Sequence, residues 1–220
     1  MTPAALIFDF DGVLIDSEYV GNRHLAQYLT SIGHPIGEAE SMARFMGLAG
    51  NDFLCAIEQW MGQPLPEDFA AARAQEDVRA LGAGVPDIAG AVDFVRALDP
   101  QLPKAIASSS SSHWINTHLA HIGLGTAFGD NIFSGREHVA RGKPAPDLYL
   151  HAANALGIPI GQTVIIEDSP VGVTGALASG ARVIGLVAGS HCGPDHEQRL
   201  RALGVEYIAR NFTEVALFLN

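Results

Sequence analysis

The sequence predicts a doubly wound parallel α/β sheet that carries a small helical cap. Short apolar, β-prone segments alternate with helix-length segments along most of the chain, which is typical of a parallel sheet covered by helices on both faces. One long stretch near the N-terminus breaks this alternation and has apolar residues at helical spacing instead. With 220 residues, 48% of them hydrophobic, the chain is long enough to bury a sizeable core.

The expected strands are short apolar runs. The first covers residues 4–8 and stops abruptly at Asp9, as expected of a buried parallel strand whose carboxyl end faces a ligand site. The others cover residues 105–107, 131–133, 163–166, 183–187 and 207–209. Helices are expected over 113–122, 146–156, 170–179 and 195–203, several of which start with Pro or Asp and end near Gly. Sheets of this kind bind ligands at the carboxyl ends of their strands.

The cap is expected to be an insertion into the sheet domain. Residues 16–81 are amphipathic throughout, so we assign them to a helical cap, and residues 1–15 and 82–220 to a Rossmann-like core. The chain returns to the core through Gly82, Gly84 and Pro86, which predict a hinge because Gly and Pro punctuate regular structure.

Composition excludes several classes of function. The net charge of −11 argues against a nucleic-acid or anionic-membrane surface, which needs clustered Lys and Arg. No apolar run approaches the ~20 residues of a membrane span, and the N-terminus lacks a basic leader, so a cytoplasmic location is expected. Cys55 and Cys192 lie far apart in sequence and are expected to form neither a disulfide framework nor, by themselves, a zinc site.

Two acidic clusters follow predicted strands. Asp9 and Asp11 alternate across Phe10, so both carboxylates can face the ligand side, and Gly12 permits a tight turn. A purely structural turn is the alternative for this segment. Glu167 and Asp168 follow the run 163–166 in the same way. Because like charges at one sheet edge are costly without a cation, and hard oxygen ligands suit Mg²⁺, the sequence predicts a magnesium site.

Two further segments have the chemistry of phosphate binding. Ser108 follows a strand and precedes a helix, where its hydroxyl and nearby N–H groups can hold phosphoryl oxygens. Ser110 or Ser111 is the expected cap of that helix. Lys143 is one of two lysines in the chain and stands before Pro144 in a stiff segment, where its ammonium can neutralise carboxylates and phosphate.

Together these residues resemble the haloacid dehalogenase-like (HAD) superfamily, in a subgroup similar to β-phosphoglucomutase and sugar-phosphate phosphatases with a helical cap after the first motif. The matching segments, in order, are Asp9-Phe-Asp11-Gly-Val, Ser108, Lys143 and Glu167-Asp168-Ser169. The resemblance implies that Asp9 is the nucleophile, Asp11 the acid/base, and Ser108 and Lys143 the phosphoryl clamp. It also implies a Mg²⁺ ion on Asp9, the carbonyl of Asp11 and Asp168, with Glu167 a direct or water-mediated ligand.

The residues favour phosphoryl transfer over the other reactions of this superfamily. Dehalogenase members lack the second acid, whereas Asp11 is present. Phosphonate-cleaving members use a cap lysine, and residues 16–81 contain none. In the mutase members a cap loop resembling residues 45–51 offers basic residues to a second phosphate. Met46 and Gly50 stand there instead, so a second phosphate would be poorly held. Arg44 is a substitute anchor nearby, and the mutase is therefore kept as the alternative.

We therefore expect a Mg²⁺-dependent phosphatase of the EC 3.1.3 type that hydrolyses a small phosphorylated sugar, sugar acid or polyol through an aspartyl-phosphate. A non-catalytic binding protein on the same scaffold is less favoured, because every group required for turnover is present. Substrate contacts are expected from Ser109, Arg44, Arg23 and His24. The chain is expected to be a monomer or weak homodimer.

Overall fold

The computed structural model describes residues 3–45, 48 and 50–219, and at its centre is a six-stranded parallel sheet with strand order β3-β2-β1-β4-β5-β6. The strands are β1 Ala5–Phe8, β2 Lys104–Ser108, β3 Ile132–Ser134, β4 Thr163–Glu167, β5 Arg182–Leu186 and β6 Tyr207–Ala209. Their ends differ from the predicted ones by no more than one residue. The predicted fold class is confirmed.

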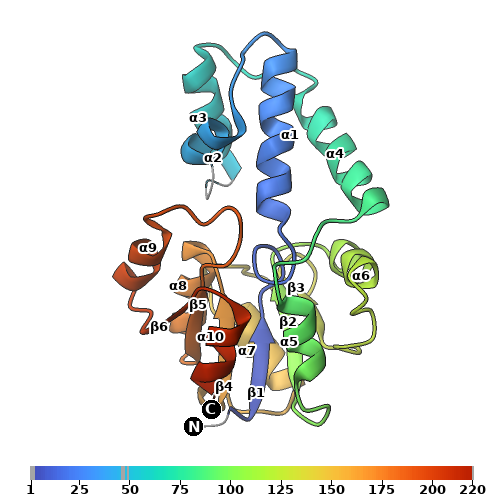
Figure 1. Ribbon diagram of the computed structural model, residues 1–220, viewed down its shortest axis with the longest axis vertical. Coiled ribbons are helices and arrows are strands. Elements are labelled where there is room, and N and C mark those ends of the chain that lie inside the picture. Colours follow the sequence, from blue (N-terminus) through green and yellow to red (C-terminus); the bar gives the residue numbers. More distant parts are fainter. Residues whose placement is uncertain (1–2, 46–47, 49, 220) are drawn as a thin grey trace.

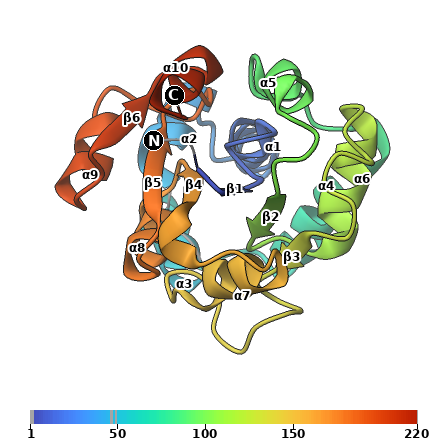
Figure 2. The same cartoon turned by 90° about the horizontal axis from the view of Figure 1, so that it is seen from below.

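Helices cover both faces of this sheet because successive side chains of each buried strand point to opposite sides. On β1, Leu6 and Phe8 pack toward one face and Ile7 packs toward the other. Figure 2 shows α5 and α10 on one side of the sheet and α7 and α8 on the other. The helices of the core are α5 Ala91–Ala97, α6 Ser112–His121, α7 Asp147–Ala155, α8 Pro170–Ala178, α9 His196–Ala202 and α10 Phe212–Leu219.

Helices α5 and α10 are absent from the sequence-based prediction. Helix α5 has only seven residues, too few to show a clear helical period. Helix α10 has the sequence FTEVALFL, in which apolar residues occupy most positions. A short apolar run of this kind does not distinguish a helix from a strand.

Four helices form a separate layer above the carboxyl edge of the sheet (Figure 1). They are α1 Ser17–Ser31, α2 Glu38–Phe45, α3 Gly50–Met61 and α4 Phe69–Ala83. They have their own hydrophobic core, whose buried members include Leu25, Leu29, Phe45, Ile57 and Phe69. We call these four helices the cap. The exact division of the chain at residues 15 and 82 stays a prediction, and α4 continues two residues past it.

The chain crosses between core and cap twice, and the two crossings run side by side. Ile15 and Asp87 form an antiparallel bridge. The backbone N–H of Asp16 donates to the carbonyl of Pro86 at 2.9 Å, and that of Ile88 donates to Leu14 at 3.1 Å. The predicted hinge segment therefore lies directly against the outgoing chain.

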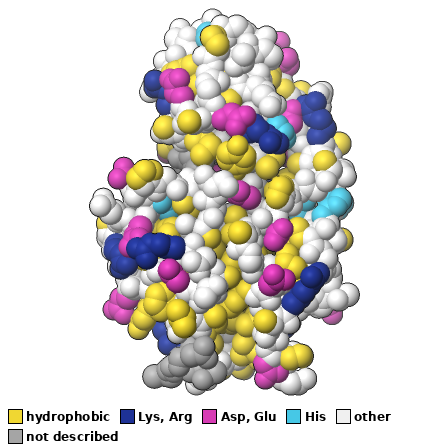
Figure 3. Space-filling view, viewed as in Figure 1, with side chains coloured by type: hydrophobic (Ala, Val, Ile, Leu, Met, Phe, Trp, Pro, Cys, Tyr) yellow, Lys and Arg dark blue, Asp and Glu magenta, His cyan; other side chains and the backbone are white. Residues whose placement is uncertain are grey.

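Among the described residues, no helix has the length and apolar character needed to cross a membrane. In the view of Figure 3, Lys and Arg side chains lie beside carboxylates and do not form one continuous basic surface. On α9, for example, Glu197 pairs with both Arg201 and Arg210. The expectation that the protein does not bind nucleic acid stays a prediction.

Candidate active site

The two acidic clusters meet because β1 and β4 are neighbours in the sheet. The backbone N–H of Asp9 donates to the carbonyl of Ile166 at 2.9 Å, which extends the ladder by one step past β1. Oxygen atoms of Asp9, Glu167 and Asp168 then lie within 4.8 Å of one another, and all three residues are buried. The carboxyl edge of the sheet thus holds three carboxylates in one small volume.

Lys143 joins two of these carboxylates. Its Nζ lies 2.7 Å from Asp9 Oδ1 and 2.7 Å from Glu167 Oε1, and only 3% of the side chain is exposed. Burial opposes the charged form of the ammonium, but the charges of Asp9 and Glu167 outweigh it and hold the pKa of Lys143 well above its usual range. The lysine is therefore a fixed positive charge at the site.

Glu167 is held by donors on both of its oxygens. Oε1 accepts from Lys143 and, at 2.8 Å, from the Tyr149 hydroxyl. Oε2 accepts from the backbone N–H of Ser169 at 2.9 Å and from its hydroxyl at 3.1 Å. Gly172 is required beside it, because a Cβ there would collide with the Glu167 carboxylate. Glu167 is thus positioned entirely by protein groups.

Asp168 has one paired and one unpaired oxygen. Oδ2 lies 2.7 Å from Nε2 of His191, whereas Oδ1 is buried without a hydrogen-bond partner among the described residues. Burial opposes protonation of the ring, but hydrogen bonds with Asp168 and Cys192 outweigh it and raise the pKa of His191 to about 11. Gly12 has φ +80°, and a Cβ there would collide with the Asp168 carboxylate, so the turn after β1 needs glycine for two reasons.

Within the described part of the chain, all side chains that donate to Asp11 are neutral. Oδ1 accepts from Ser17 at 2.7 Å and from the indole N–H of Trp114 at 3.1 Å. Oδ2 accepts from Ser110 at 2.6 Å and from Ser108 at 3.3 Å. The two carboxylates of the first motif therefore lie in different environments, one paired with a lysine and the other with hydroxyl and indole groups.

The charge balance of the site suits a cation. Burial raises the pKa of Asp9, Lys143 opposes this, and the negative charges of Glu167 and Asp168 raise it further. An additional positive charge would stabilise all three ionised carboxylates. The unpaired Oδ1 of Asp168 is an available hard oxygen ligand, and such oxygens suit a divalent cation of the Mg²⁺ type. The residues present fit a metal ion.

The predicted substrate contacts are not gathered at this edge. Ser109 is exposed, and its neighbour Ser110 makes the contact with Asp11. In the cap, Arg44 pairs with Glu40 at 2.8 Å, and the ring of His24 lies 3.0 Å from Glu76. Arg23 has a buried Nε without a hydrogen-bond partner in the described part of the chain. Their roles toward a substrate stay predictions.

The segment 45–51, which resembles the cap loop of the mutases, lies partly outside the described residues. Met46 lies outside the described residues, and Gly50 is the first residue of α3. Arg44 is near the end of α2 and lines a shallow hollow with Phe45, Ala56, Gln59 and Trp60.

Five residues at the site are not among the predicted site members. Ser17, the first residue of α1, donates to Asp11. Ser110 is one of the two predicted caps of α6, but Ser111 takes that role by accepting from the N–H of Trp114. Trp114 and Tyr149 reach the site from α6 and α7, and His191 from the loop after β5. The sequence contains a signal for His191, because this residue follows the predicted strand 183–187, and parallel strands bring their carboxyl ends to one edge of the sheet. The structure places the carboxyl end of β5 beside that of β4. No local pattern marks Trp114 or Tyr149 as a neighbour of a carboxylate.

A family model and individual relatives place the chain in the same protein family. A family model described as haloacid dehalogenase-like hydrolase matches residues 3–180. The chain is 30% identical to Hexitol phosphatase A of Escherichia coli (strain K12) over 83% of its length and 82% of that protein. It is 29% identical to Fructose-1-phosphate phosphatase YqaB of the same organism, over 80% of its length and 93% of that protein.

A solved structure shows the same fold. It is a HAD family hydrolase from Deinococcus radiodurans R1 with bound phosphate and sodium, and it is 32% identical with a TM-score of 0.86. The match covers 98% of this chain and 94% of the other. The sheet, the cap and the acidic edge described above agree with the family match, and the chain belongs to the haloacid dehalogenase-like hydrolases.

Proposed function

We propose that the protein is a Mg²⁺-dependent phosphatase that acts on a small phosphomonoester through a phosphorylated Asp9. The observation that carries this is the difference between the two carboxylates of the first motif. Asp9 is fixed by Lys143 in a buried cluster of charge, and Asp11 is held separately by neutral donors. Two carboxylates in contrasting environments are suited to two chemical roles.

In the first half of the reaction an oxygen of Asp9 attacks phosphorus and the bond to the leaving alkoxide oxygen breaks. Asp11 donates a proton to that oxygen, so a neutral alcohol leaves and Asp9 carries the phosphoryl group. In the second half Asp11 takes a proton from water as the water attacks phosphorus. Inorganic phosphate leaves and the Asp9 carboxylate is restored. Lys143 and Ser108 bind the phosphoryl oxygens during both steps.

The metal is assigned to Asp9, the backbone carbonyl of Asp11 and Asp168. When bound, Mg²⁺ supplies charge neutralisation to the transferring phosphoryl group. Because both oxygens of Glu167 are already hydrogen-bonded, the water-mediated contact is the better supported of its two predicted forms. For Asp168, the buried and unpaired Oδ1 supports direct coordination of the metal.

The substrate class is proposed to be a phosphorylated sugar, sugar acid or polyol. Support comes from the relatives whose names specify hexitol and fructose 1-phosphate phosphatases. The cap residues Arg23, His24 and Arg44 are proposed to contact the part of the substrate beyond the phosphate. The proposed location is cytoplasmic.

The test is phosphate release from a panel of phosphorylated sugars, sugar acids and polyols, measured after EDTA treatment and after Mg²⁺ is restored. We expect release only with Mg²⁺. Activity that persists in EDTA would contradict the metal assignment, and inactivity across the panel with Mg²⁺ would contradict the phosphatase.

The mutase alternative has a separate test, and no described contact specifically favours it. β-Glucose 1-phosphate is supplied with a bisphosphate primer, and glucose 6-phosphate and free phosphate are both measured. Free phosphate without isomerised product is the expected result. Formation of glucose 6-phosphate would replace the phosphatase proposal by the mutase.

A further inference from the structure

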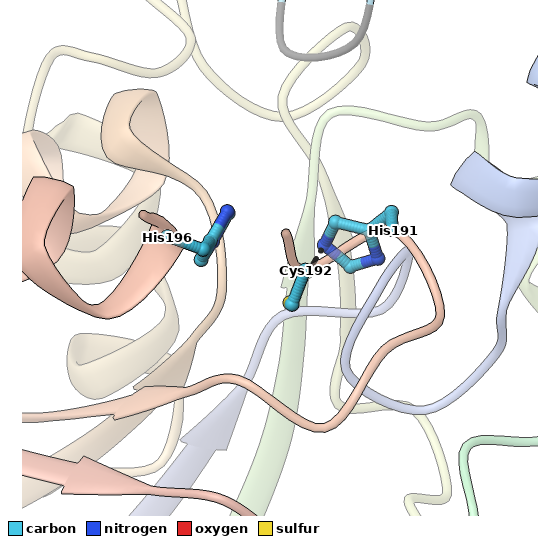
Figure 4. Close-up of side chains that lie close together, drawn as sticks. All are labelled: His191, Cys192 and His196. Carbon is cyan, nitrogen blue, oxygen red and sulfur yellow. Dashed lines mark hydrogen bonds between the residues drawn. The ribbon is translucent and has the colours of Figure 1, made fainter. Parts of the chain in front are cut away.

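A second cluster of metal-ligating side chains lies beside the acidic edge, and the proposed phosphatase reaction does not use it. It consists of His191, Cys192 and His196. His191 and Cys192 lie on the loop after β5, and His196 is the first residue of α9. Figure 4 shows Cys192 between the two imidazole rings. One nitrogen from each ring and the Cys192 sulfur lie within 4.8 Å of one another.

The donor atoms of this cluster differ in kind from those at the acidic edge. Imidazole nitrogen and cysteine sulfur are preferred ligands of Zn²⁺ and related transition metals, whereas Mg²⁺ prefers oxygen. Zinc binds nitrogen at about 2.0–2.1 Å and sulfur at about 2.3 Å, so two such ligands of one tetrahedral ion lie roughly 3.5 Å apart. The separation between Cys192 Sγ and His191 Nε2 is 3.4 Å.

Packing fixes the His191 ring in this position. A Cβ at Gly189 would collide with the ring, and one at Gly12 would come within 2.9 Å of its Cε1. The ring of His196 crosses it nearly at a right angle, with an interplanar angle of 87° and centroids 5.6 Å apart. Two imidazoles in this arrangement can direct nitrogen atoms toward one point without stacking on each other.

Both histidines also contact Asp168, which connects the cluster to the acidic edge. His191 Nε2 lies 2.7 Å from Asp168 Oδ2, and His196 Nε2 lies 2.6 Å from the backbone carbonyl of Asp168. A metal that takes His191 Nε2 displaces its proton and therefore removes the hydrogen bond from His191 to the Asp168 carboxylate. The cluster supplies three protein ligands, and a tetrahedral ion keeps its fourth position for water.

We infer that His191, Cys192 and His196 form a second metal site, selective for Zn²⁺ and similar transition metals, which is coupled to the catalytic centre through the contact between His191 and Asp168. A metal bound there breaks this contact, changes the position and charge balance of Asp168 and lowers phosphatase activity. The metal-binding part of the inference stands on the cluster alone, and the inhibitory part rests on the proposed function.

Cobalt reports this site directly, because tetrahedral Co²⁺ bound to a thiolate absorbs through a sulfur-to-cobalt charge-transfer band. The full chain, freed of metal, is titrated with Co²⁺ in the absence of Mg²⁺. We expect one thiolate-bound Co²⁺ per chain, which Zn²⁺ displaces. Cys192→Ser should abolish the charge-transfer band, and His196→Gln should weaken Co²⁺ binding at least about tenfold.

The chain offers a matched control in its other cysteine. Cys55 lies on α3 in the cap and is partly buried, so Cys55→Ser should keep the full cobalt spectrum. Circular dichroism and thermal unfolding show whether each variant is folded. Absence of the band in the unaltered chain, or its survival in folded Cys192→Ser, would overturn the site.

Zinc inhibition at saturating Mg²⁺ tests the link to catalysis. We expect Cys192→Ser to need at least about ten times more Zn²⁺ than Cys55→Ser for half inhibition, each compared with its own zinc-free rate. Equal inhibition of both would show that Zn²⁺ acts at the Mg²⁺ site and would overturn the coupling through Asp168. If no substrate is hydrolysed in Mg²⁺, the proposed function fails, while the cobalt spectrum still decides the metal site.

Discussion

The acidic edge of the sheet and the cap both contain paired charged side chains, but they differ in how far these pairs are buried. At the edge, Lys143 and Glu167 are 3% and 0% exposed and pair across segments far apart in sequence. In the cap, Arg44 and Glu40 are both 49% exposed and lie one helical turn apart. Buried pairs are held in one geometry by the fold, whereas exposed pairs exchange readily with water. This contrast suits fixed chemistry in the core and adjustable recognition in the cap.

Replacement of the proposed nucleophile tests the edge most severely. Asp9→Asn should lower phosphate release by on the order of 10⁴-fold or more, because the amide fills the same space but is a poor nucleophile. The variant should still fold, which thermal unfolding checks. Activity within tenfold of the unaltered enzyme would remove Asp9 from the nucleophile role.

Loss of the buried cation should affect both activity and stability. Lys143→Met leaves Asp9 and Glu167 unpaired, so we expect the free energy of unfolding to fall by about 3–5 kcal/mol in EDTA. Phosphate release should fall by on the order of 10²-fold or more. The control is Lys104→Met. This other lysine begins β2, at the end of the strand away from Ser108 and the acidic edge, and the variant should keep normal activity. Equal effects from both variants would contradict a specific role of Lys143.

The hydroxyl of Tyr149 should make a smaller contribution. Tyr149→Phe removes one donor from Glu167 while Lys143 and Ser169 remain. We expect a loss of about 1 kcal/mol in urea unfolding, and a lower affinity for Mg²⁺ measured by calorimetry. An unchanged free energy of unfolding would show that this hydrogen bond has little net effect.

The cap should respond in the opposite way, with a change in substrate affinity and little change in stability. Arg44→Ala removes an exposed helix pair worth about 0.3–0.5 kcal/mol. If the proposed substrate contact is made, KM rises several-fold while kcat is unchanged. Arg79→Ala is the control, because Arg79 pairs with Glu76 and is 64% exposed. Equal KM values for the two variants would eliminate Arg44 as a substrate contact.

Glu18 at the start of α1 connects the two regions and should show the smallest effect. Burial by surrounding protein and the charge on Asp168 raise the pKa of Glu18 to about 6, above its ordinary value of 4.5. A raised carboxyl pKa means that the folded chain binds the proton more tightly than the unfolded chain. Stability is therefore lost as pH rises from about 4.5 to 6.

Glu18→Gln should remove this loss. We expect a gain of less than about 1 kcal/mol at pH 7.5 in EDTA, because Glu18, although desolvated by the protein packed around it, keeps substantial exposed surface and solvent partly screens its charge. At pH 4.5 the gain should vanish. Urea unfolding at the two pH values measures both, and an equal effect at both would contradict the raised pKa.

The contrast between the regions also explains what the sequence could predict. Parallel strands bring their carboxyl ends to one edge, so Asp9, Ser108 and Glu167 could be placed together once the strands were recognised. The donors to Asp11 could not, because Trp114 reaches it only through the docking of α6, which depends on the packing of Ile115 and Leu119. In the cap, helical periodicity predicted helices but could not orient Arg23 or His24 relative to the edge.

The paired crossings between Ile15 and Asp87 have a consequence for how the cap can vary. The two ends of the inserted segment are hydrogen-bonded to each other where they leave the core. The cap is therefore a loop closed at its base, and the bonds that close it do not involve the cap helices. The entropic cost of closing a flexible loop grows by only about 0.6 kcal/mol for each doubling of its length. Helices can therefore be lengthened, shortened or exchanged beyond this junction at little cost to the sheet, and the carboxylates at its edge keep their positions.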